Sequence, residues 1–304
     1  MDRDALLALA RDHGAEVRFG EPMWRHTSLR IGGEAEFFLR PSGWACVPGL
    51  LEGFWASGLP FRVMGGGTNL LVQDGPLGFG VLALGRCGGS VRWEGSEGEA
   101  DADVPLPALC IQATRRGLSG LEGMEGIPGT VGGGLVMNAG AFGCEMGKVV
   151  REVFVVEKAG GLVRRPASDF EFAYRTSTVR GAGVAVGCRF GLEAADIEEV
   201  RRRAAAAKER RQASQPWREA TAGSIFKNPP GDHAGRVLES LGFKGKRRGG
   251  VGFSDLHANF LVNHGGSCFS DAYGLCEEAR EAALRSGVSL SYEVEIWRAE
   301  EAGV

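Results

Sequence analysis

Residues 117–147 read GLSGLEGMEGIPGTVGGGLVMNAGAFGCEMG, and 11 of these 31 residues are glycine. Glycine loses more backbone freedom on folding than any other residue, so this density lowers stability unless the local structure requires it. Glycine is required where the backbone turns through positive φ or approaches a ligand closely. Runs of backbone N–H groups in such turns bind anions and suit a pyrophosphate. The segment therefore predicts a ligand-binding loop, with plain tight turns as the alternative.

A second glycine turn, Gly65-Gly66-Gly67-Thr68-Asn69, lies between two short strand-like runs at 59–64 and 70–72. Two such turns in one chain, both with polar side chains inside them, favour ligand binding over simple turns. Neither is a standard nucleotide motif, because G-x-x-x-x-G-K-[ST] is absent. The second turn also lacks the third glycine and the following helix of a dinucleotide-binding βαβ unit. The residues alone indicate an enzyme that holds a diphosphate in glycine loops.

The composition of the whole chain is that of a globular enzyme. It has 304 residues, of which 49 are glycine, 43% are apolar and 24% are charged. This balance excludes collagen and a disordered polymer, and the length suggests two or three domains. The formal charge of −3 leaves no overall basic footprint for nucleic acid. No apolar run reaches the roughly 18 residues of a membrane span, so neither nucleic acid nor membrane is an expected partner.

The cysteines and histidines are not spaced as metal ligands. The seven cysteines are scattered without a C-x-x-C pair, and the five histidines lack H-x-x-x-H spacing. A structural zinc site, a metal-centred hydrolase and a secreted disulfide framework are therefore not expected. Reduced thiols in a cytoplasm, with no bound metal, fit this pattern better.

The pattern of apolar residues predicts the main elements. Apolar side chains at helical spacing predict helices over 4–13, 196–213, 234–241 and 271–286. Extended runs predict strands over 35–39, 59–64, 70–72, 80–84, 149–157, 184–190 and 288–297. The arginines of the 196–213 helix are interpreted as a solvated face.

Several motifs together resemble those of one known family. Residues 126–133 (GIPGTVGG) and 137–143 (MNAGAFG) resemble the FAD loop of UDP-N-acetylenolpyruvoylglucosamine reductases, the MurB family, and 65–70 (GGGTNL) resembles its pyrophosphate turn. Further matches follow the family order: 26–33 (HTSLRIGG), 174–177 (YRTS), 223–229 (GSIFKNP), 257–263 (HANFLVN) and 293–294 (EV). The compact stretch between Asn228 and His257 resembles the shorter type, which lacks an extra substrate-domain loop.

The resemblance implies a fold and an activity. The fold is α+β, a two-subdomain FAD-binding fold of the vanillyl-alcohol-oxidase type plus a C-terminal α+β substrate-binding domain. The expected bounds are 1–75 and 76–205 for the FAD subdomains, with a return of the terminal strand 289–304 to the second left open, and 206–288 for the substrate domain. Non-covalent FAD, reduced by NADPH, would reduce UDP-GlcNAc-enolpyruvate to UDP-N-acetylmuramate, a cytoplasmic peptidoglycan precursor. The chain is expected to act as a monomer or weak oligomer.

The resemblance also assigns roles to residues. Hydride addition to the terminal enolpyruvyl carbon moves negative charge toward the carboxylate, which Arg175 can bind through two parallel hydrogen bonds. Ser224 is the expected proton donor, and Glu293 is the acidic partner, which needs burial to stay protonated. Substrate contacts fall on Tyr174, Lys227, Asn228 and His257. Cofactor contacts fall on Gly65, Gly66, Gly67, Thr68, Asn69, Leu70, Gly129, Thr130, Gly132, Gly133, Asn138, Ala139 and Gly140.

Plainer interpretations of the same residues exist. Without the family, Arg175 would be a surface ion-pair partner and Ser224 a loop or N-cap serine. Glu293 would be a solvent-facing residue of a terminal strand, equivalent to Glu295 on spacing alone.

The chain departs from the family pattern at three positions. Ser214 stands where lysine often precedes Gln-Pro, Leu256 where lysine is usual, and Glu295 where arginine is common. The frequent lysine contacts the substrate diphosphate, and its candidate replacements are Arg210, Arg211 and Lys227.

Two alternative functions stay open. One is another flavin oxidoreductase of the same fold that acts on a sugar or hydroxy acid; rapid reoxidation by oxygen without response to the enolpyruvyl nucleotide would favour it. The other is a non-catalytic nucleotide-sugar-binding protein; failure of NADPH to bleach the flavin would favour it.

Overall fold

The computed structural model describes residues 3–158 and 161–299. The chain folds into two compact units, each built from non-contiguous segments. Unit 1 comprises the N-terminal segment to Phe19, Phe37–Gly66 and Phe79–Glu209, and unit 2 comprises Gly20–Glu36, Gly67–Gly78 and the chain from Arg210. The glycine turn at 65–69 therefore contributes to both units, because the boundary falls between Gly66 and Gly67.

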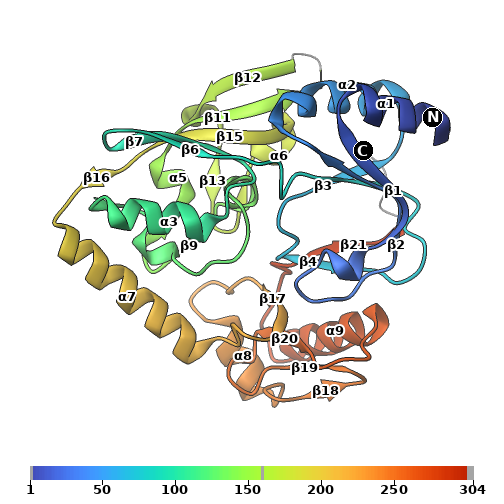
Figure 1. Ribbon diagram of the computed structural model, residues 1–304. Helices are drawn as coiled ribbons and strands as arrows, with labels where there is room; N and C mark the ends of the chain where they lie inside the picture. The colour runs from blue at the N-terminus through green and yellow to red at the C-terminus, as the bar shows by residue number, and fades with distance from the viewer. Residues whose placement is uncertain (1–2, 159–160, 300–304) are drawn as a thin grey trace. The chain divides into compact units, whose positions relative to one another are not determined.

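The N-terminal part of unit 1 packs two helices beside a small sheet (Figure 1). The helices are α1 (Arg3–Asp12) and α2 (Val47–Ser57). The sheet has the order β1-β2-β5-β3, with β1 at Ala15–Pro22, β2 at Glu34–Pro41, β5 at Gly80–Ala83 and β3 at Phe61–Met64. Strands β2 and β3 both run parallel to β5. Strand β3 ends at the residue before the glycine turn, so this sheet positions the start of that turn.

The second part of unit 1 is a five-stranded antiparallel sheet of order β12-β11-β15-β7-β6. Its strands are β6 (Val91–Glu94), β7 (Glu97–Asp101), β11 (Val150–Glu157), β12 (Gly161–Pro166) and β15 (Val184–Gly191). Helix α4 (Val131–Val136) contacts β15 and β7. The glycine-rich segment 117–147 thus packs on this sheet, and Val131 and Leu135 of α4 belong to its buried core.

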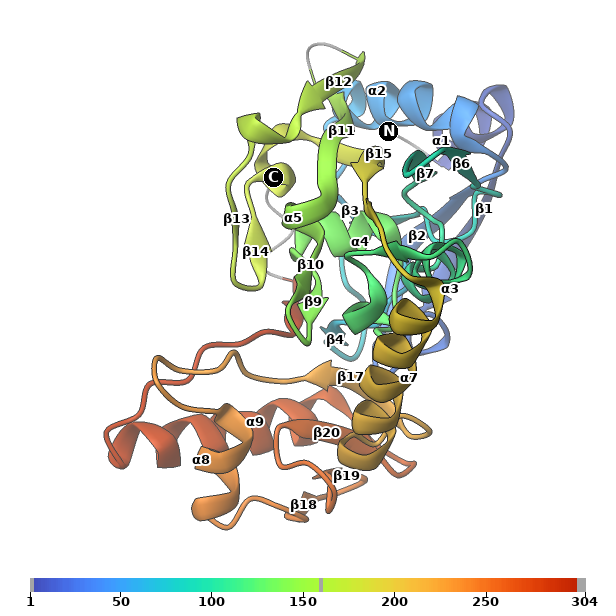
Figure 2. The ribbon, with the colours of Figure 1, turned by 90° about the vertical axis from the view of Figure 1, so that its left-hand side faces the viewer.

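Unit 2 combines helices with a small sheet (Figure 2). Its sheet has the order β17-β20-β19-β18, formed by Ala220–Ser224, Phe260–Asn263, Val251–Phe253 and Arg247–Arg248. Helix α9 (Phe269–Arg285) contacts β18 and β19, and α8 (Ala234–Ser240) contacts α9. Strand β21 (Glu295–Trp297) pairs in parallel with β4 (Leu70–Val72). The core between these elements includes the buried side chains of Leu71, Phe226 and Leu275.

The remaining elements complete the two units. The helices are α3 (Leu106–Arg115), α5 (Met146–Val149), α6 (Val179–Ala182) and α7 (Ile197–Ser214). The short strands are β8 (Leu118–Ser119), β9 (Gly140–Ala141), β10 (Cys144–Glu145), β13 (Phe172–Ala173), β14 (Thr176–Ser177) and β16 (Glu193–Ala194). The 3-10 turns are η1 (Met23–Arg25), η2 (Trp44–Cys46), η3 (Glu122–Met124) and η4 (Ala167–Asp169).

The predicted helices are confirmed as α1, α7, α8 and α9, with ends shifted by one or two residues. Helices α2 and α3 were not predicted, and each contains a proline near its start. Pro48 and Pro107 lie in the first turn, where the missing N–H removes no intrahelical bond. Both prolines are therefore compatible with the start of a helix.

The predicted terminal strand over 288–297 is wrong for most of its length, since only Glu295–Trp297 forms a strand. The preceding residues bond to the loop that follows β17 instead: Lys227 N–H donates to Ser291, and Glu293 N–H donates to Ile225. The strand that does form pairs with β4 rather than with a strand of the 76–205 segment, and residues 300–304 lie outside the described residues. The bounds 1–75, 76–205 and 206–288 stay predictions.

Within the described ranges, none of the helices combines the length and apolar character needed to cross a membrane. All seven cysteines are free thiols, and four of them are buried. Burial raises the pKa of the Cys110 and Cys188 thiols to about 12, so both stay protonated. These two cysteines pack as small apolar side chains in the core of unit 1.

Candidate active site

The two predicted cofactor segments meet in unit 1 at Gly65 and Thr130. A Cβ atom placed on Gly65 would lie 2.6 Å from Thr130 Oγ1, so only glycine allows this approach. Thr130 is the N-cap of α4, and its hydroxyl accepts from the N–H of Gly133 at 3.4 Å. Gly132 N–H donates to Ala102 at 2.8 Å, and this holds the loop against the residues after β7. The structure therefore brings the two glycine segments together.

Asn138 ties the second glycine segment to the hairpin that carries Tyr174 and Arg175. Its side chain is 2% exposed, and its backbone has a φ of 42°, which few residues other than glycine adopt. Asn138 Oδ1 accepts from Gly147 N–H at 2.9 Å, and Nδ2 donates to the Ala173 carbonyl at 3.1 Å. Asn138, a predicted cofactor residue, therefore holds two segments of unit 1 together.

Tyr174 and Arg175 form the two-residue tip of the β13–β14 hairpin, because Ala173 pairs with Thr176. Arg175 has a φ of 57°, and its guanidinium lies 5.0 Å from the centroid of the Tyr174 ring, a cation–π distance. Ser177 anchors the hairpin by donating to the Leu135 carbonyl at 2.7 Å at the end of α4. The Tyr174 side chain is 51% exposed. The hairpin therefore presents an aromatic ring and a guanidinium from an anchored base.

Gly67 begins the unit 2 part of the glycine turn and is packed against the 26–28 segment. It has a φ of +65°, and an added Cβ would lie 2.0 Å from the His26 carbonyl oxygen. Ser28 N–H donates to the Gly67 carbonyl at 3.0 Å. His26 Nε2 lies 2.8 Å from Glu21 Oε1, and both side chains are largely buried. Residues 26–28 therefore pack directly against the glycine turn.

Replacing Gly67 with alanine is expected to lower the free energy of unfolding by well over about 1 kcal/mol, since the added methyl group meets a backbone carbonyl at positive φ. The matched control is Gly78→Ala, where φ is +70° but an added Cβ meets nothing within 4 Å. Urea unfolding of both apoproteins measures the difference. Equal losses in the two variants would mean that the carbonyl contact has no effect.

In unit 2 hydrogen bonds link Asn69, Glu293 and Ile225, the residue that follows Ser224. Ser224 is the last residue of β17, and the next residue, Ile225, accepts from Glu293 N–H at 2.8 Å. Asn69 Nδ2 donates to the Glu293 carbonyl at 3.0 Å, and Glu295 N–H donates to the Asn69 carbonyl at 3.0 Å. The end of the glycine turn is therefore bonded to the Glu293 segment, which is bonded to the residue after Ser224.

The structure separates the two glutamates that spacing alone could not. Glu293 lies outside the terminal strand and bonds through its backbone to Ile225 and Asn69. Glu295 lies in β21, and its Oε1 accepts from the indole N–H of Trp297 at 3.0 Å. Glu295 thus has a packing role beside a buried tryptophan.

Three further predicted substrate residues lie near Ser224 in sequence or across the sheet. Lys227 N–H donates to the Ser291 carbonyl at 2.9 Å, which places it beside the Glu293 segment. Asn228 Oδ1 accepts from Ala234 N–H at 3.1 Å and so caps the first turn of α8. His257 Nδ1 accepts from Asn259 N–H at 3.2 Å. Burial lowers the pKa of His257, so its ring is neutral at neutral pH.

Asn259 supports the Ser224 loop, and sequence reasoning assigned it no role. Its side chain is 2% exposed and pairs with both backbone groups of Phe226: Phe226 N–H donates to Oδ1 at 3.0 Å, and Nδ2 donates to the Phe226 carbonyl at 2.8 Å. Ile225 N–H donates to the Asn259 carbonyl at 2.9 Å. The side-chain amide and the backbone carbonyl of Asn259 therefore fix the two residues that follow Ser224. The polar residue inside the apolar run 258–262 was the available signal.

Replacing Asn259 with alanine is expected to lower the free energy of unfolding by about 2–4 kcal/mol, because a buried N–H and a buried carbonyl of Phe226 lose their partner. Asn228→Ala, which removes the bond to Ala234 N–H from an exposed residue, is the control and should have a smaller effect. Denaturant unfolding measures both variants. Similar losses for the two would show that the amide does not hold this loop.

A second missed cluster supports the same loop from α9. Tyr292 Oη donates to Glu277 Oε1 at 2.6 Å, and Arg280 Nη2 donates to Glu277 Oε2 at 2.7 Å. The Tyr292 and Phe226 ring centroids lie 5.1 Å apart. Hydrogen bonds from Arg280 and Tyr292 lower the pKa of Glu277, whereas burial raises that of Tyr292. The residues next to Ser224 and Glu293 are thus packed against a paired carboxylate.

The departures from the family pattern have local structural roles. Ser214 Oγ donates to the Arg210 carbonyl at 2.7 Å in the last turn of α7. Arg211 Nη1 donates to Gln215 Oε1 at 3.1 Å, so this arginine is held by the residue after Ser214. Leu256 is exposed. Of the three candidate replacements for the missing lysine, Lys227 is the one placed beside the Glu293 segment.

The paired glycine loops of unit 1 fit a flavin dinucleotide. Gly66 and Gly133 are exposed and carry no side chain, while Gly65 and Gly132 pack too closely for a Cβ atom. Bare backbone at Gly65 and Gly66 presents no side-chain barrier to a pyrophosphate. The Thr130 hydroxyl lies between the two loops.

Known proteins and family models match this chain over most of its length. Residues 35–165 match a model of an FAD binding domain, and residues 215–297 match a model of the UDP-N-acetylenolpyruvoylglucosamine reductase C-terminal domain. The chain is 40% identical to UDP-N-acetylenolpyruvoylglucosamine reductase 2 of Symbiobacterium thermophilum, over 97% of this chain and 96% of that one. It is 41% identical to the Alkalilimnicola ehrlichii reductase, over 96% and 98%. The crystal structure of the Thermus caldophilus reductase superposes with a TM-score of 0.79 at 33% identity, covering 93% of this chain and 98% of that one.

Proposed function

Because the chain belongs to the UDP-N-acetylenolpyruvoylglucosamine reductase family, we propose a specific set of residues for its reaction. The protein is an FAD- and NADPH-dependent oxidoreductase that reduces UDP-GlcNAc-enolpyruvate to UDP-N-acetylmuramate in peptidoglycan synthesis. Its fold is the expected α+β FAD-binding fold with a C-terminal substrate-binding domain.

One observation carries the assignment of residues. The Asn69 amide at the end of the glycine turn donates to the Glu293 carbonyl, and Glu293 N–H donates to the carbonyl of Ile225, the residue after Ser224. These bonds connect the proposed cofactor turn, the proposed acid and the proposed proton donor within unit 2. A displacement of any one of these segments would therefore alter the positions of the other two.

The chain's own residues stabilise the negative charge that develops on the substrate and deliver one proton to it. Saturation of the vinyl ether adds a hydride to the terminal carbon and a proton to the carbon that bears the carboxylate. Arg175 binds that carboxylate, because a guanidinium offers two parallel N–H donors to the charge that develops there. Ser224 Oγ–H gives its proton to the neighbouring carbon and regains one from solvent. Glu293 stabilises the enol form by hydrogen bonding to the same carboxylate.

When bound, FAD would supply the two-electron chemistry between NADPH and the vinyl ether. Backbone groups of Gly65 and Gly66, with the Thr130 hydroxyl, would hold its pyrophosphate, and Asn138 holds the second loop in shape. Lys227 is the proposed contact for the substrate diphosphate in place of the usual lysine near Ser214. Tyr174 and Asn228 complete the proposed substrate contacts, and His257 contributes as a neutral ring.

We also place the reaction in the cytoplasm. The support is chemical: all seven cysteines are free thiols, which a reducing compartment preserves.

The test of the function is product formation. Purified protein, NADPH and UDP-GlcNAc-enolpyruvate are incubated without oxygen, and the nucleotide is identified by mass spectrometry. The expected product is UDP-N-acetylmuramate, which carries two additional hydrogens, in an amount equal to the NADPH consumed. NADPH consumption that requires oxygen and ignores the nucleotide would instead support an oxidase of sugars or hydroxy acids.

A further inference from the structure

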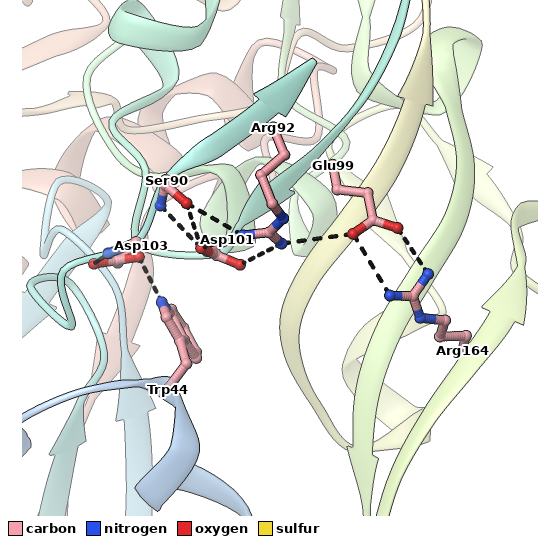
Figure 3. A network of polar contacts seen from close by, with 8 residues as sticks. Trp44, Ser90, Arg92, Glu99, Asp101, Asp103 and Arg164 are labelled. Atoms are coloured by element: carbon pink, nitrogen blue, oxygen red, sulfur yellow. Dashed lines mark hydrogen bonds and ion pairs between the residues drawn. The ribbon is translucent and has the colours of Figure 1, made fainter. Parts of the chain in front are cut away.

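Asp103 is a buried acid of unit 1 that the reaction does not use. Asp103 is 6% exposed and lies between the end of β7 and the start of α3. Its carboxylate accepts three N–H groups: Trp44 Nε1 at 2.9 Å on Oδ1, and Cys87 and Gly89 at 2.7 and 3.0 Å on Oδ2. Figure 3 shows this carboxylate directed at the Trp44 indole, with Asp101 and the arginines on the other side of Ser90.

The loop that Asp103 holds lies behind the first glycine segment. Residues 84–89 follow β5, and a Cβ atom on Gly85 would lie 2.6 Å from the Gly65 carbonyl oxygen. Leu84 N–H donates to the Met64 carbonyl at 2.8 Å, so this loop runs beside the end of β3. Cys87, only two residues beyond Gly85, is the residue whose N–H bonds to Asp103 at 2.7 Å. The carboxylate therefore fixes the surface on which Gly65 and Gly66 rest.

The residues on either side of Asp103 hold the second glycine segment. The Ala102 carbonyl accepts from Gly132 N–H at 2.8 Å, and the Val104 carbonyl accepts from Val131 N–H at 2.9 Å. Residues 102–104 therefore contact two different segments. The backbone of Ala102 and Val104 bonds to residues 131–132, and the Asp103 side chain bonds to residues 87–89, which support Gly65 and Gly66. A rotation of the stretch that improved one contact would disturb the other.

We propose that Asp103 is a positioning residue that sets the spacing between the two glycine loops that bind FAD. The inference rests on the proposed cofactor loops. Three buried donors converge on one carboxylate, and no other side-chain type of this size accepts all three, because asparagine would turn an N–H group toward one of them. An ordinary structural acid would stabilise the fold without altering the affinity for FAD.

The neighbouring polar network provides a matched control. Glu99 lies on β7, just before Asp103 in the chain, and pairs with Arg164 at 2.7 Å and Arg92 at 3.5 Å, in contacts that are more exposed than those of Asp103. Glu99→Gln alters a carboxylate in the same region without touching residues 87–89 or 131–132. Trp44→Phe removes one of the three donors and leaves the two backbone donors bonded.

The experiment measures the dissociation constant of FAD by quenching of flavin fluorescence on titration of the apoproteins. Asp103→Ala is expected to raise this constant by about tenfold or more, since three buried N–H groups lose their acceptor, while Glu99→Gln stays at the wild-type value. Asp103→Asn should also weaken binding, and the double variant Asp103→Asn with Trp44→Phe should recover part of the loss, because the amide N–H then faces no donor. The shape of the bound flavin absorption band should follow the same order.

The outcomes distinguish this inference from the proposed function. A wild-type protein that binds no FAD would overturn the cofactor assignment and this inference with it. A wild-type protein that binds FAD, together with an Asp103→Ala variant that binds it equally well, would overturn this inference alone. Should Asp103→Ala not fold, the double variant decides: no recovery of FAD affinity relative to Asp103→Asn contradicts the proposal.

Discussion

Replacing Ser224 with alanine is expected to slow the reoxidation of reduced flavin by UDP-GlcNAc-enolpyruvate by about 10²–10⁴-fold. Reduction of the flavin by NADPH should stay near the wild-type rate. The hydroxyl is the proposed proton donor, and its loss leaves the backbone bonds of the segment intact, because Ile225 still accepts from Glu293 and still donates to Asn259. Anaerobic stopped-flow absorbance measures the two half-reactions separately.

The matched control for this variant is Ser240→Ala. Ser240 also lies in unit 2, and its Oγ donates to the Val237 carbonyl at 2.8 Å at the end of α8. This control should leave both half-reactions unchanged. If Ser224→Ala slowed the two half-reactions equally, the serine would be a structural residue and the assignment of the proton donor would be wrong.

Arg175→Lys is expected to lower kcat by about 10²–10³-fold, although the positive charge is kept. Lysine has no planar fork, so it cannot bind a carboxylate through two parallel N–H donors. The hairpin itself should survive, because Ser177 and Asn138 anchor it through bonds that do not involve the Arg175 side chain. Steady-state turnover with saturating NADPH measures the effect.

Arg189→Lys serves as the control for the arginine. Arg189 lies on β15 and pairs with Glu97 at 2.7 Å on the surface of the same unit. Surface pairs of this kind contribute little, so turnover should change by less than about twofold. Near-normal turnover of Arg175→Lys would remove Arg175 from the proposed role.

The two glycine turns could be predicted from the sequence because short motifs mark them. Segment 117–147 was predicted to approach a ligand, and the structure places Thr130 against Gly65. The closeness of Ser224 and Glu293 could be expected only from the family resemblance, since about 70 residues separate them. The structure explains it by one bond between Glu293 N–H and the Ile225 carbonyl.

What the sequence could not predict are contacts made by side chains with distant backbone. Asn259 pairs with Phe226, and Asp103 with Cys87 and Gly89, without any periodic pattern that marks an acceptor. The terminal strand was overpredicted for a related reason. Its alternating residues resemble a strand, but Glu293 bonds to a loop rather than to a neighbouring strand. Tertiary hydrogen bonds therefore override local propensity where the proposed catalytic residues lie.

The most direct test of the account is the visible absorbance of the purified protein in a single anaerobic cuvette. The protein should show the bands of oxidised flavin, lose them on addition of NADPH, and regain them on addition of UDP-GlcNAc-enolpyruvate. Reduced flavin that stays bleached after the enolpyruvyl nucleotide and recovers only when oxygen is admitted would contradict the central claim.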